Sequence, residues 1–413
     1  MRTPPSDQDA MNLDPIVEQH LRYSGGKALP TLRNLVVVLS LDPRWTDRLS
    51  WSTLDRTVYV EDRRVTDRDL LATSIWVDEV YGIRVGMRVV DSAITLIAGE
   101  RSFHPVADWL RKDPHDGVAR IDTFLSTYFG APDTPLVRRI GAAWLIGAVA
   151  RAIQPGCVND AMLLLVSSQE REVVEGLAAL APRPEWFREL TGREVVRDPG
   201  EGLAGAWICT IRGIDGLPGG VPQSTASLAT TAVDRGRALR AGRRVDLPRQ
   251  SALVAVTGVD ELFQPPAVAR HLWPVRVGAP QVAAIHKDAP QIFSEAFARY
   301  RAGEPWHLSG PYAGLLGDAQ REFASVDPWD LPLSAWAAHQ HHPFTLEAAL
   351  GTGLGLPTAR WTDAVRARVG RVLTRLGYEQ TRPRSSQKRR PRRWEASGEQ
   401  PESVSSALVP TQS

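Results

Sequence analysis

Apolar residues recur at helical spacing in some stretches of the chain and form short unbroken runs in others. Helical spacing is clearest between Asp133-Thr134-Pro135, which supplies a cap and an N1 proline, and Pro155-Gly156, which ends the pattern. Residues 162–166 (MLLLV) are wholly apolar, which is typical of a buried central strand. Helical spacing returns in residues 170–181, and residues 206–211 and 251–258 are further strand candidates. The centre of the chain therefore predicts an α/β domain with a sheet.

The segment from Asp14 to about Glu100 predicts a small, mainly helical unit. Residues 32–40 (LRNLVVVLS) are compatible with either a strand or a helix. Asp67 is expected to cap a later helix. One face of that helix is expected to carry Leu70, Leu71, Ile75 and Trp76.

From Thr345 onward the sequence predicts two helices followed by a basic segment. Residues 345–351 indicate a short helix, and Thr362 can cap a second helix that ends before Gly377. The apolar stripe of the second helix is Val365, Val369, Val372, Leu373 and Leu376. Tyr378 to Trp394 then holds a basic cluster with Ser385-Ser386 as its expected hairpin tip. A helix, a turn, a second helix and a basic hairpin are the layout of a winged helix.

Charge is distributed unevenly over the 413 residues. The chain has a formal net charge of +2, of which residues 381–413 contribute +4, so the rest is close to neutral. A basic cluster of this kind indicates a polyanion as partner. Of the 49 basic residues 45 are arginine, so any chemistry that needs lysine is restricted to four positions: Lys27, Lys112, Lys287 and Lys388.

Several classes of protein are excluded by composition. We expect no membrane span, because no run of about 18 apolar residues exists, and no secretory signal, because the first residues lack an apolar segment. Cys157 and Cys209 are too few for a disulfide framework, which favours a cytoplasmic location. We predict no metal site, since the spacing of His339, His341 and His342 is not that of a common zinc site.

Residues 103–157 carry HP…DWL, a DG…RID segment and a final PGC in an order and spacing that resemble the virulence-associated protein E family. The similarity extends through residues 246–258 (DLPRQSALVAVTG), 271–278 (HLWPVRVG), 299–308 and 360–378. The resemblance implies a P-loop NTPase-type α/β core, similar to superfamily-three-type replicative helicases of phages and mobile elements. It also implies a primase or DNA-binding partner domain.

The resemblance places a phosphate-binding P-loop after MLLLV, and the residues at that position differ from what a P-loop requires. Glycines there let backbone N–H groups wrap the phosphates, a lysine reaches the β- and γ-phosphates, and Ser or Thr holds Mg²⁺. Here Glu170 and Glu172 stand where the loop glycines belong, Val173 replaces the lysine and Val174 replaces Ser or Thr. The degenerate nucleotide-binding set is Ser167, Ser168, Gln169, Glu170, Glu172, Val173 and Val174.

Other parts expected of an ATPase are also altered. The resemblance makes Asp215 a remnant of the acidic Walker B pair, with Arg212 and Gly213 at positions that are acidic or small in the family. An ordinary turn residue in an Asp-Gly pair is the alternative interpretation of Asp215. Gly258 stands where a polar sensor, usually Asn, is expected. Arg270 is a possible remnant of an arginine finger, although a surface arginine is an equally good interpretation.

These patterns predict the following division of the chain. Residues 1–13 are disordered, 14–132 form a helical amino-terminal region, 133–325 the P-loop NTPase-type domain, 326–344 a linker, 345–394 a winged-helix-like basic module and 395–413 a disordered tail. The DNA-binding set is predicted to be Arg366, Arg368, Arg371, Arg375, Lys388, Arg389, Arg390, Arg392 and Arg393.

The leading hypothesis is a catalytically degenerate family member that binds DNA and regulates replication of a phage or mobile element. DNA is the expected partner, together with a homo-oligomeric ring or a hetero-assembly with an active relative, and no cofactor is expected. One alternative is an active ATPase and DNA helicase with an atypical phosphate site, which would need ATP and Mg²⁺. Another is an interaction module that co-assembles with or inhibits a related helicase.

Overall fold

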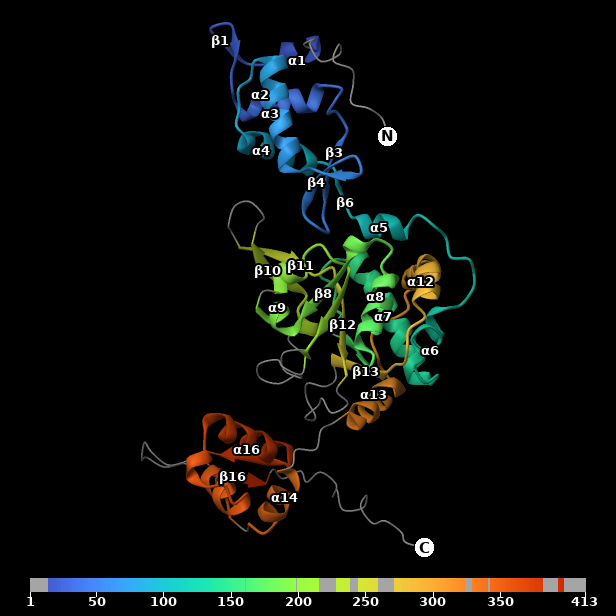
Figure 1. Cartoon of the computed structure of the whole chain (residues 1–413), viewed down its shortest axis with the longest axis vertical. Helices are drawn as coiled ribbons and strands as arrows, with labels where there is room; N and C mark the ends of the chain where they lie inside the picture. Colours follow the sequence, from blue (N-terminus) through green and yellow to red (C-terminus); the bar gives the residue numbers. More distant parts are fainter. Residues whose placement is uncertain are drawn as a thin grey trace.

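The computed structural model describes residues 14–159, 161–197, 199–214, 228–237, 244–258, 271–323, 329–340, 342–381 and 393–396. An amino-terminal unit, a central domain and a carboxy-terminal unit follow one another along the longest axis of the molecule (Figure 1). The outer units each have a hydrophobic cluster of their own, and the central domain has one on each face of its sheet. The predicted disordered segment 1–13 lies outside the described residues, as do residues 397–413 of the predicted disordered tail 395–413, whose first two residues belong to β16.

The amino-terminal unit contains more strand than the mainly helical unit that the sequence predicts. Its helices are α1 (Pro15–His20), α2 (Leu32–Leu41), α3 (Asp67–Tyr81) and α4 (Met87–Gly99). Its strands are β1 (Tyr23–Ser24), β2 (Lys27–Ala28), β3 (Leu49–Ser52), β4 (Thr57–Val60), β5 (Arg63–Arg64) and β6 (Ser102–Phe103). Strands β1 and β2 form a hairpin, and the other four form a sheet in the order β5-β4-β3-β6.

Helix α3 corrects two details of the sequence prediction. Thr66 rather than Asp67 is the N-cap: its side chain accepts a hydrogen bond from Asp69 N, and the Asp69 carboxylate accepts one from Thr66 N. Leu71 and Ile75 are each 51% exposed. The buried face consists of Leu70, Thr73, Val77 and Tyr81. These positions follow the helical repeat of 3.6 residues, which turns Leu71 and Ile75 away from the core.

The central domain is a five-stranded parallel sheet covered by helices on both faces, which confirms the predicted α/β class. The strand order is β13-β7-β12-β9-β8. The strands are β7 (Met162–Val166), β8 (Phe187–Thr191), β9 (Ile208–Arg212), β12 (Ala252–Thr257) and β13 (Leu272–Arg276). An antiparallel hairpin of β10 (Val233–Arg237) and β11 (Arg244–Pro248) stands between β9 and β12 in the sequence.

The unbroken apolar run in β7 is explained by burial of both faces of the sheet. Leu163 and Leu165 belong to the larger cluster, which also contains residues of α7 (Pro135–Ile153), α8 (Glu170–Leu180) and α12 (Val282–Arg301). Met162, Leu164 and Val166 face the smaller cluster on the other side, because successive side chains of a strand alternate. On this side lie α9 (Gly192–Arg197) and α10 (Pro199–Gly202), and α13 (Pro311–Glu322) contacts the edge strand β13.

The central domain begins before the predicted boundary at residue 133. Helices α5 (Pro105–Leu110) and α6 (Phe124–Phe129) precede α7 and contribute buried residues such as Leu110 and Phe124 to the larger cluster. Helix α7 has the predicted Thr134 cap and N1 proline. Almost every α7 residue from Ile140 to Ala152 is buried, so this helix crosses the middle of the domain.

The carboxy-terminal unit contains a helix that the sequence analysis assigned to a linker. Residues 326–344 include α14 (Asp330–Ala338), whose Leu333 and Ala337 are buried in the cluster of this unit. The other elements are β14 (Phe344–Thr345), α15 (Leu346–Ala348), a π-helical turn (Ala349–Gly353), a 3₁₀ turn (Thr358–Arg360), α16 (Asp363–Arg375), β15 (Tyr378–Thr381) and β16 (Arg393–Ala396). Thr362 caps α16 as predicted. The strands pair in the order β14-β16-β15, and β16 extends two residues beyond the predicted end of the module.

Candidate functional site

The order of the strands makes the carboxyl ends of β7 and β12 a topological switch point. From β7 the chain continues through α8 to β8 at one edge of the sheet, whereas from β12 it continues to β13 at the opposite edge. Connections that leave two neighbouring strands in opposite directions form the position at which open α/β sheets bind ligands. We refer to this position, with the residues that follow β7, β9 and β12, as the switch-point crevice.

A turn of three residues joins β7 to α8 at this crevice. Ser167 N donates to Thr257 O over 3.0 Å, which continues the pairing of β7 with β12. Gln169 N donates to the buried Ser167 Oγ over 3.1 Å. Helix α8 then begins at Glu170. The turn is therefore held by one hydrogen bond of its own and one to the end of β12.

The carboxylate of Glu170 lies between the ends of β12 and β9. Gly258 N donates to Glu170 Oε1 over 2.9 Å. An added Cβ at Gly258 would lie 3.0 Å from the same oxygen, so a larger residue would displace the carboxylate. Arg212 Nε stands 3.5 Å from Glu170 Oε2 at the end of β9.

A second carboxylate from β8 completes this group. Arg212 Nη1 donates to Glu189 Oε1 over 3.0 Å. The hydrogen bond with Glu189 and the charges of Glu189 and Glu170 raise the pKa of Arg212 above its ordinary value. The sequence analysis did not single out Glu189. Its place on the edge strand next to β9 is the signal that could have identified it, once β8 was recognised as a strand.

The two valines at the predicted lysine and Ser/Thr positions do not face the crevice. Val173 and Val174 are 0% and 6% exposed and belong to the larger hydrophobic cluster of the central domain. Because α8 begins at Glu170, both valines already lie within the helix, on its buried face. Ser168 and Glu172 are exposed. The structure thus brings Ser167, Gln169 and Glu170 to the crevice and directs the valines into the core.

Two predicted catalytic remnants cannot be placed. Asp215 and Arg270 lie outside the described residues, in segments 215–227 and 259–270. Gly213 follows Arg212 with φ +64, a left-handed conformation that suits glycine, and Ile214 is fully buried.

The charged groups at the switch-point crevice form an ion pair within the chain, between Arg212 and Glu170. The backbone N–H of Gly258 and the guanidinium of Arg212 are the kinds of donor that hold a phosphate. Here both interact with a carboxylate of the chain itself. The first turn of α8 also carries Glu172, and negative charge at a helix N-terminus is electrostatically favourable.

A family model for the virulence-associated protein E-like domain matches residues 110–325. The chain belongs to this family. The matched region extends from the end of α5 through α13, so the virulence-associated protein E-like domain coincides with the central domain of the fold. The sequence resemblance is confirmed over these residues.

Among solved structures, the chain is similar to apo structures of the C-terminal region of NrS-1. One is 9% identical with a TM-score of 0.43, and the similarity covers 80% of this chain and 85% of that one. A second, described as the A form, is 9% identical with a TM-score of 0.43 and coverage of 85% and 96%. No curated protein matches the chain.

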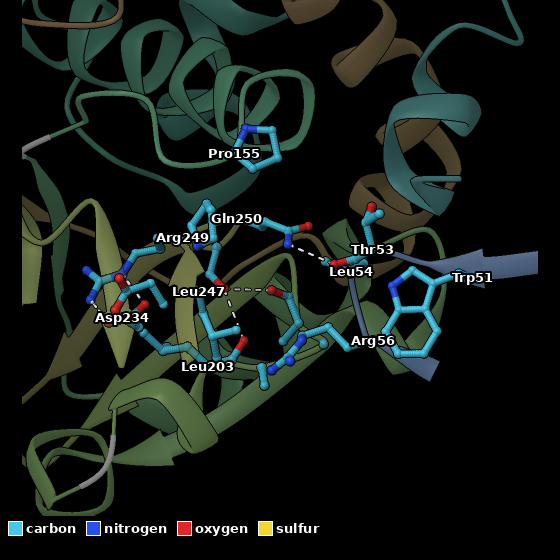
Figure 2. Close-up of a pocket in the computed structure, with 16 residues that line it drawn as sticks. Trp51, Thr53, Leu54, Arg56, Pro155, Leu203, Asp234, Leu247, Arg249 and Gln250 are labelled. Carbon is cyan, nitrogen blue, oxygen red and sulfur yellow. Dashed lines mark hydrogen bonds and ion pairs between the residues drawn. The ribbon is translucent and has the colours of Figure 1, made fainter. Parts of the chain in front are cut away.

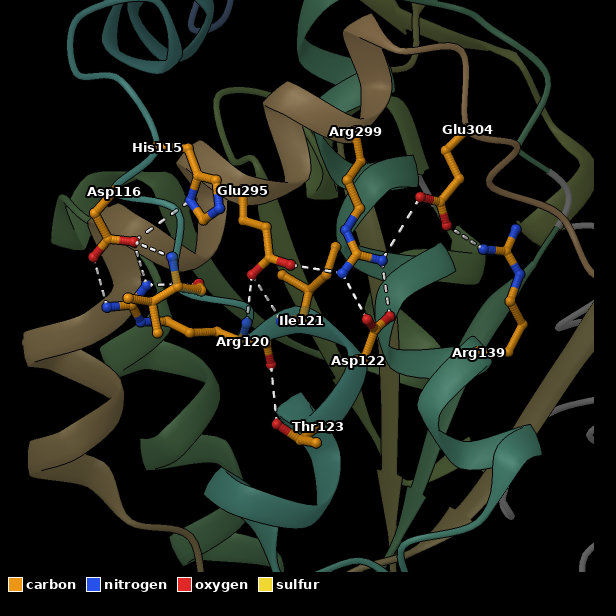
Figure 3. A network of polar contacts seen from close by, with 11 residues as sticks. His115, Asp116, Arg120, Ile121, Asp122, Thr123, Arg139, Glu295, Arg299 and Glu304 are labelled. Carbon is orange, nitrogen blue, oxygen red and sulfur yellow. Dashed lines mark hydrogen bonds and ion pairs between the residues drawn. The ribbon is translucent and has the colours of Figure 1, made fainter.

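A polar network fastens the start of the virulence-associated protein E-like domain to α12 (Figure 3). The buried Glu295 accepts hydrogen bonds from the backbone nitrogens of Arg120 and Ile121, at 2.5 and 3.1 Å, and from Arg299 Nη2 at 2.7 Å. Arg299 also makes two hydrogen bonds to Asp122, at 2.8 and 2.6 Å. The predicted DG…RID segment is therefore a structural element of this domain, held through its backbone and its aspartate.

Two arginines of the predicted DNA-binding set have partners within the carboxy-terminal unit. Arg366 Nη1 donates to Glu347 Oε1 over 2.8 Å. The guanidinium carbon of Arg368 lies 3.9 Å from the centre of the Trp329 ring, a cation–π contact. These contacts join α16 to α15 and to the residue that precedes α14. Both arginines therefore contribute to packing of the unit.

The remaining members of the set are described only in part. Arg393 is exposed at the start of β16. Arg371 and Arg375 belong to α16 by their backbone. Lys388, Arg389, Arg390 and Arg392 lie outside the described residues, as does the predicted hairpin tip at Ser385-Ser386. Strands β15 and β16 pair antiparallel on either side of this gap.

The described residues contain neither a membrane-spanning helix nor a metal-binding cluster. No helix among them is long and apolar enough to cross a membrane. Within the same residues, no group of three or more His, Cys, Asp or Glu side chains is arranged to hold a metal ion. His341 lies outside the described part of the chain.

Proposed function

We propose that this protein is a catalytically degenerate virulence-associated protein E-like factor that binds DNA and regulates replication of a phage or mobile element. The observation that carries the proposal is the contact of Glu170 with Gly258 N and Arg212 at the switch-point crevice. This carboxylate of the chain itself accepts the hydrogen bond of Gly258 N and pairs electrostatically with Arg212, two groups suited to hold a nucleotide phosphate.

Electrostatics supports the absence of ATP hydrolysis. A triphosphate in the crevice would meet the carboxylates of Glu170 and Glu189, which lie on either side of Arg212. Val173 can neither neutralise phosphate charge nor reach the crevice, because it is fully buried in the core. A nucleotide that displaced Glu170 would also leave Arg212 with Glu189 as its single carboxylate partner. Nucleotide binding would have to offset the free energy of the lost Glu170 contacts.

The order of elements in the carboxy-terminal unit supports DNA binding. Helix α14, strand β14, helices α15 and α16, and then strands β15 and β16 form the succession that is typical of a winged helix. Residues 329–396 contain twelve arginines and lysines against five acidic residues. Such an excess of positive charge on a small unit is the electrostatic footprint of a nucleic-acid-binding module.

An ATPase assay tests the catalytic half of the proposal. Because phosphate binding and metal binding both lack their usual side chains, we expect no phosphate release above background with Mg²⁺-ATP, with or without single-stranded DNA. Hydrolysis that Asp215→Ala abolishes would contradict the proposal and would support an active helicase with an atypical site. Absence of both hydrolysis and DNA binding, with assembly onto a related helicase, would support an interaction module.

A further inference from the structure

A pocket lies near the amino-terminal ends of strands β9 and β12, between the amino-terminal unit and the central domain (Figure 2). It has a volume of about 300 Å³. Trp51, Thr53, Leu54 and Arg56 form one side, from β3 and the turn that leads to β4. The other side consists of residues at the amino ends of β9 and β12 and on the β10–β11 hairpin. We call it the interface pocket. Junctions between units are a common position for small-molecule sites.

The two sides of the interface pocket are joined by direct contacts. Gln250 Nε2 donates to Thr53 O over 2.9 Å across the junction (Figure 2). Gly205, with φ +79, approaches the amino-terminal unit so closely that an added Cβ would lie 3.2 Å from Asp55 Cβ. The two sides of the pocket are therefore held against each other by packed parts of the chain.

Arg56 is the unusual residue of this pocket. Its φ of +55 is a left-handed conformation that arginine rarely adopts and that glycine would adopt without strain. Its guanidinium makes no hydrogen bond or ion pair with the described residues, although the side chain is half-buried. In Figure 2 this side chain extends from the turn toward the central domain. Strained backbone of this kind is concentrated at functional sites.

Two other residues share this backbone conformation and provide a comparison. Asp47 has φ +65 and forms an ion pair with Arg101, and Glu61 has φ +55 and forms one with Arg48. Their side chains thus have partners within the amino-terminal unit. Arg56 has the same strained turn geometry, and its charge is directed into the pocket without such a partner.

The other walls restrict the ligand. Asp234 and Arg249 also line the pocket, but they neutralise each other in a buried ion pair with two hydrogen bonds, at 2.9 and 2.6 Å. Arg56 is therefore the cation offered to a ligand by the described walls, and Trp51 offers an aromatic ring beside it. Across the pocket, Asp246 is an exposed acceptor for amino or ring N–H groups.

We propose that the interface pocket binds a nucleotide, either as a free nucleoside monophosphate or as one terminal nucleotide of a single strand. The guanidinium of Arg56 holds the phosphate through its paired N–H donors. The base stacks on Trp51, and its amino group faces Asp246. The volume is at the lower limit for ligand pockets, which suits a single nucleotide. This site is separate from the switch-point crevice and does not depend on the proposed DNA binding by the carboxy-terminal unit.

Calorimetric titration of the full chain with the four deoxynucleoside monophosphates tests this proposal. We expect at least one to bind with 1:1 stoichiometry. Arg56→Gly removes the guanidinium at a position where glycine fits the backbone, so we expect unchanged or higher thermal stability and about ten- to hundred-fold weaker binding. Trp51→Leu is expected to weaken binding at least about five-fold by loss of stacking.

A matched variant separates the pocket from other sites. Glu61→Gly alters a charged residue with the same backbone conformation outside the pocket, so this variant should bind mononucleotides as the parent chain does. A short oligonucleotide with and without a 5′-phosphate distinguishes a strand end from a free nucleotide, since only a strand-end site makes affinity depend on that phosphate. No binding of any probe at millimolar concentration, or equal binding by Arg56→Gly, would overturn the proposal.

Discussion

Replacing Asp234 by alanine is expected to lower the free energy of unfolding of the central domain by about 3–5 kcal/mol. Asp234 and Arg249 are 5% and 1% exposed at the side chain, and Arg249 also donates to the Leu228 carbonyl. Without the aspartate, the guanidinium remains buried with its charge uncompensated. Urea denaturation followed by tryptophan fluorescence measures the loss, because Trp144, Trp186 and Trp207 are buried in this domain.

Two comparisons make this prediction specific. Asp133 and Arg138 form an ion pair of similar geometry, with two hydrogen bonds of 2.6 Å, on the surface of the same domain. Asp133→Ala should have little effect, because water solvates the arginine that remains. The double variant Asp234→Leu with Arg249→Met removes both charges and should recover most of the stability. A loss for Asp234→Ala no larger than that for Asp133→Ala would contradict the prediction.

Neutralising the basic residues between β15 and β16 is expected to weaken DNA binding by roughly 10³-fold at physiological salt. The variant changes Lys388, Arg389, Arg390, Arg392 and Arg393 to glutamine. The slope of log K against log salt is negative, and each phosphate contact that is lost reduces its magnitude by about 0.9, so the loss of five contacts reduces it by about 4–5. Fluorescence anisotropy over a salt series with two unrelated duplexes measures both quantities. The loss should be similar for both sequences, because phosphate contacts do not specify bases.

The control for this five-residue glutamine variant removes five positive charges from the amino-terminal unit instead. Five exposed arginines of the amino-terminal unit, Arg22, Arg33, Arg68, Arg84 and Arg88, are changed to glutamine. Substitution is preferable to deletion of residues 379–394, because deletion removes part of β15 and the buried Trp394, which packs against Gly370 of α16. Equal salt slopes for the two variants would contradict a specific role of the basic segment.

The sequence predicted α7, β7, α8, β9 and β12 of the central domain because their signals are local and strong, whereas it did not predict β8, β13 and α12. The Thr134 cap and N1 proline define the start of α7, and the wholly apolar run at 162–166 required a strand buried on both faces. Helix α14 was missed because only Leu333 and Ala337 of its nine residues are buried, which leaves little apolar periodicity. Leu71 and Ile75 were misplaced because α3 has several apolar residues on more than one face.

The sequence could predict a candidate site only where a stretch of residues could be compared with a known motif. The altered residues at 167–174 could be recognised as a departure from a P-loop. That Glu170 interacts with Gly258 and Arg212 could not, since three segments separated by at least forty residues meet there only through the strand order. Arg56 carries no motif, and its importance follows from a backbone angle and the absence of a partner among the described residues.

The most direct test of a switch-point crevice closed by the chain's own carboxylate is calorimetric titration with Mg²⁺-ATP. The titration should use Arg56→Gly, so that binding at the interface pocket is about ten- to hundred-fold weaker, and should be repeated without Mg²⁺. We expect no saturable binding at millimolar nucleotide, because the Glu170 carboxylate accepts the hydrogen bond of Gly258 N and forms an ion pair with Arg212. Saturable, Mg²⁺-dependent binding of one ATP per chain would contradict this account.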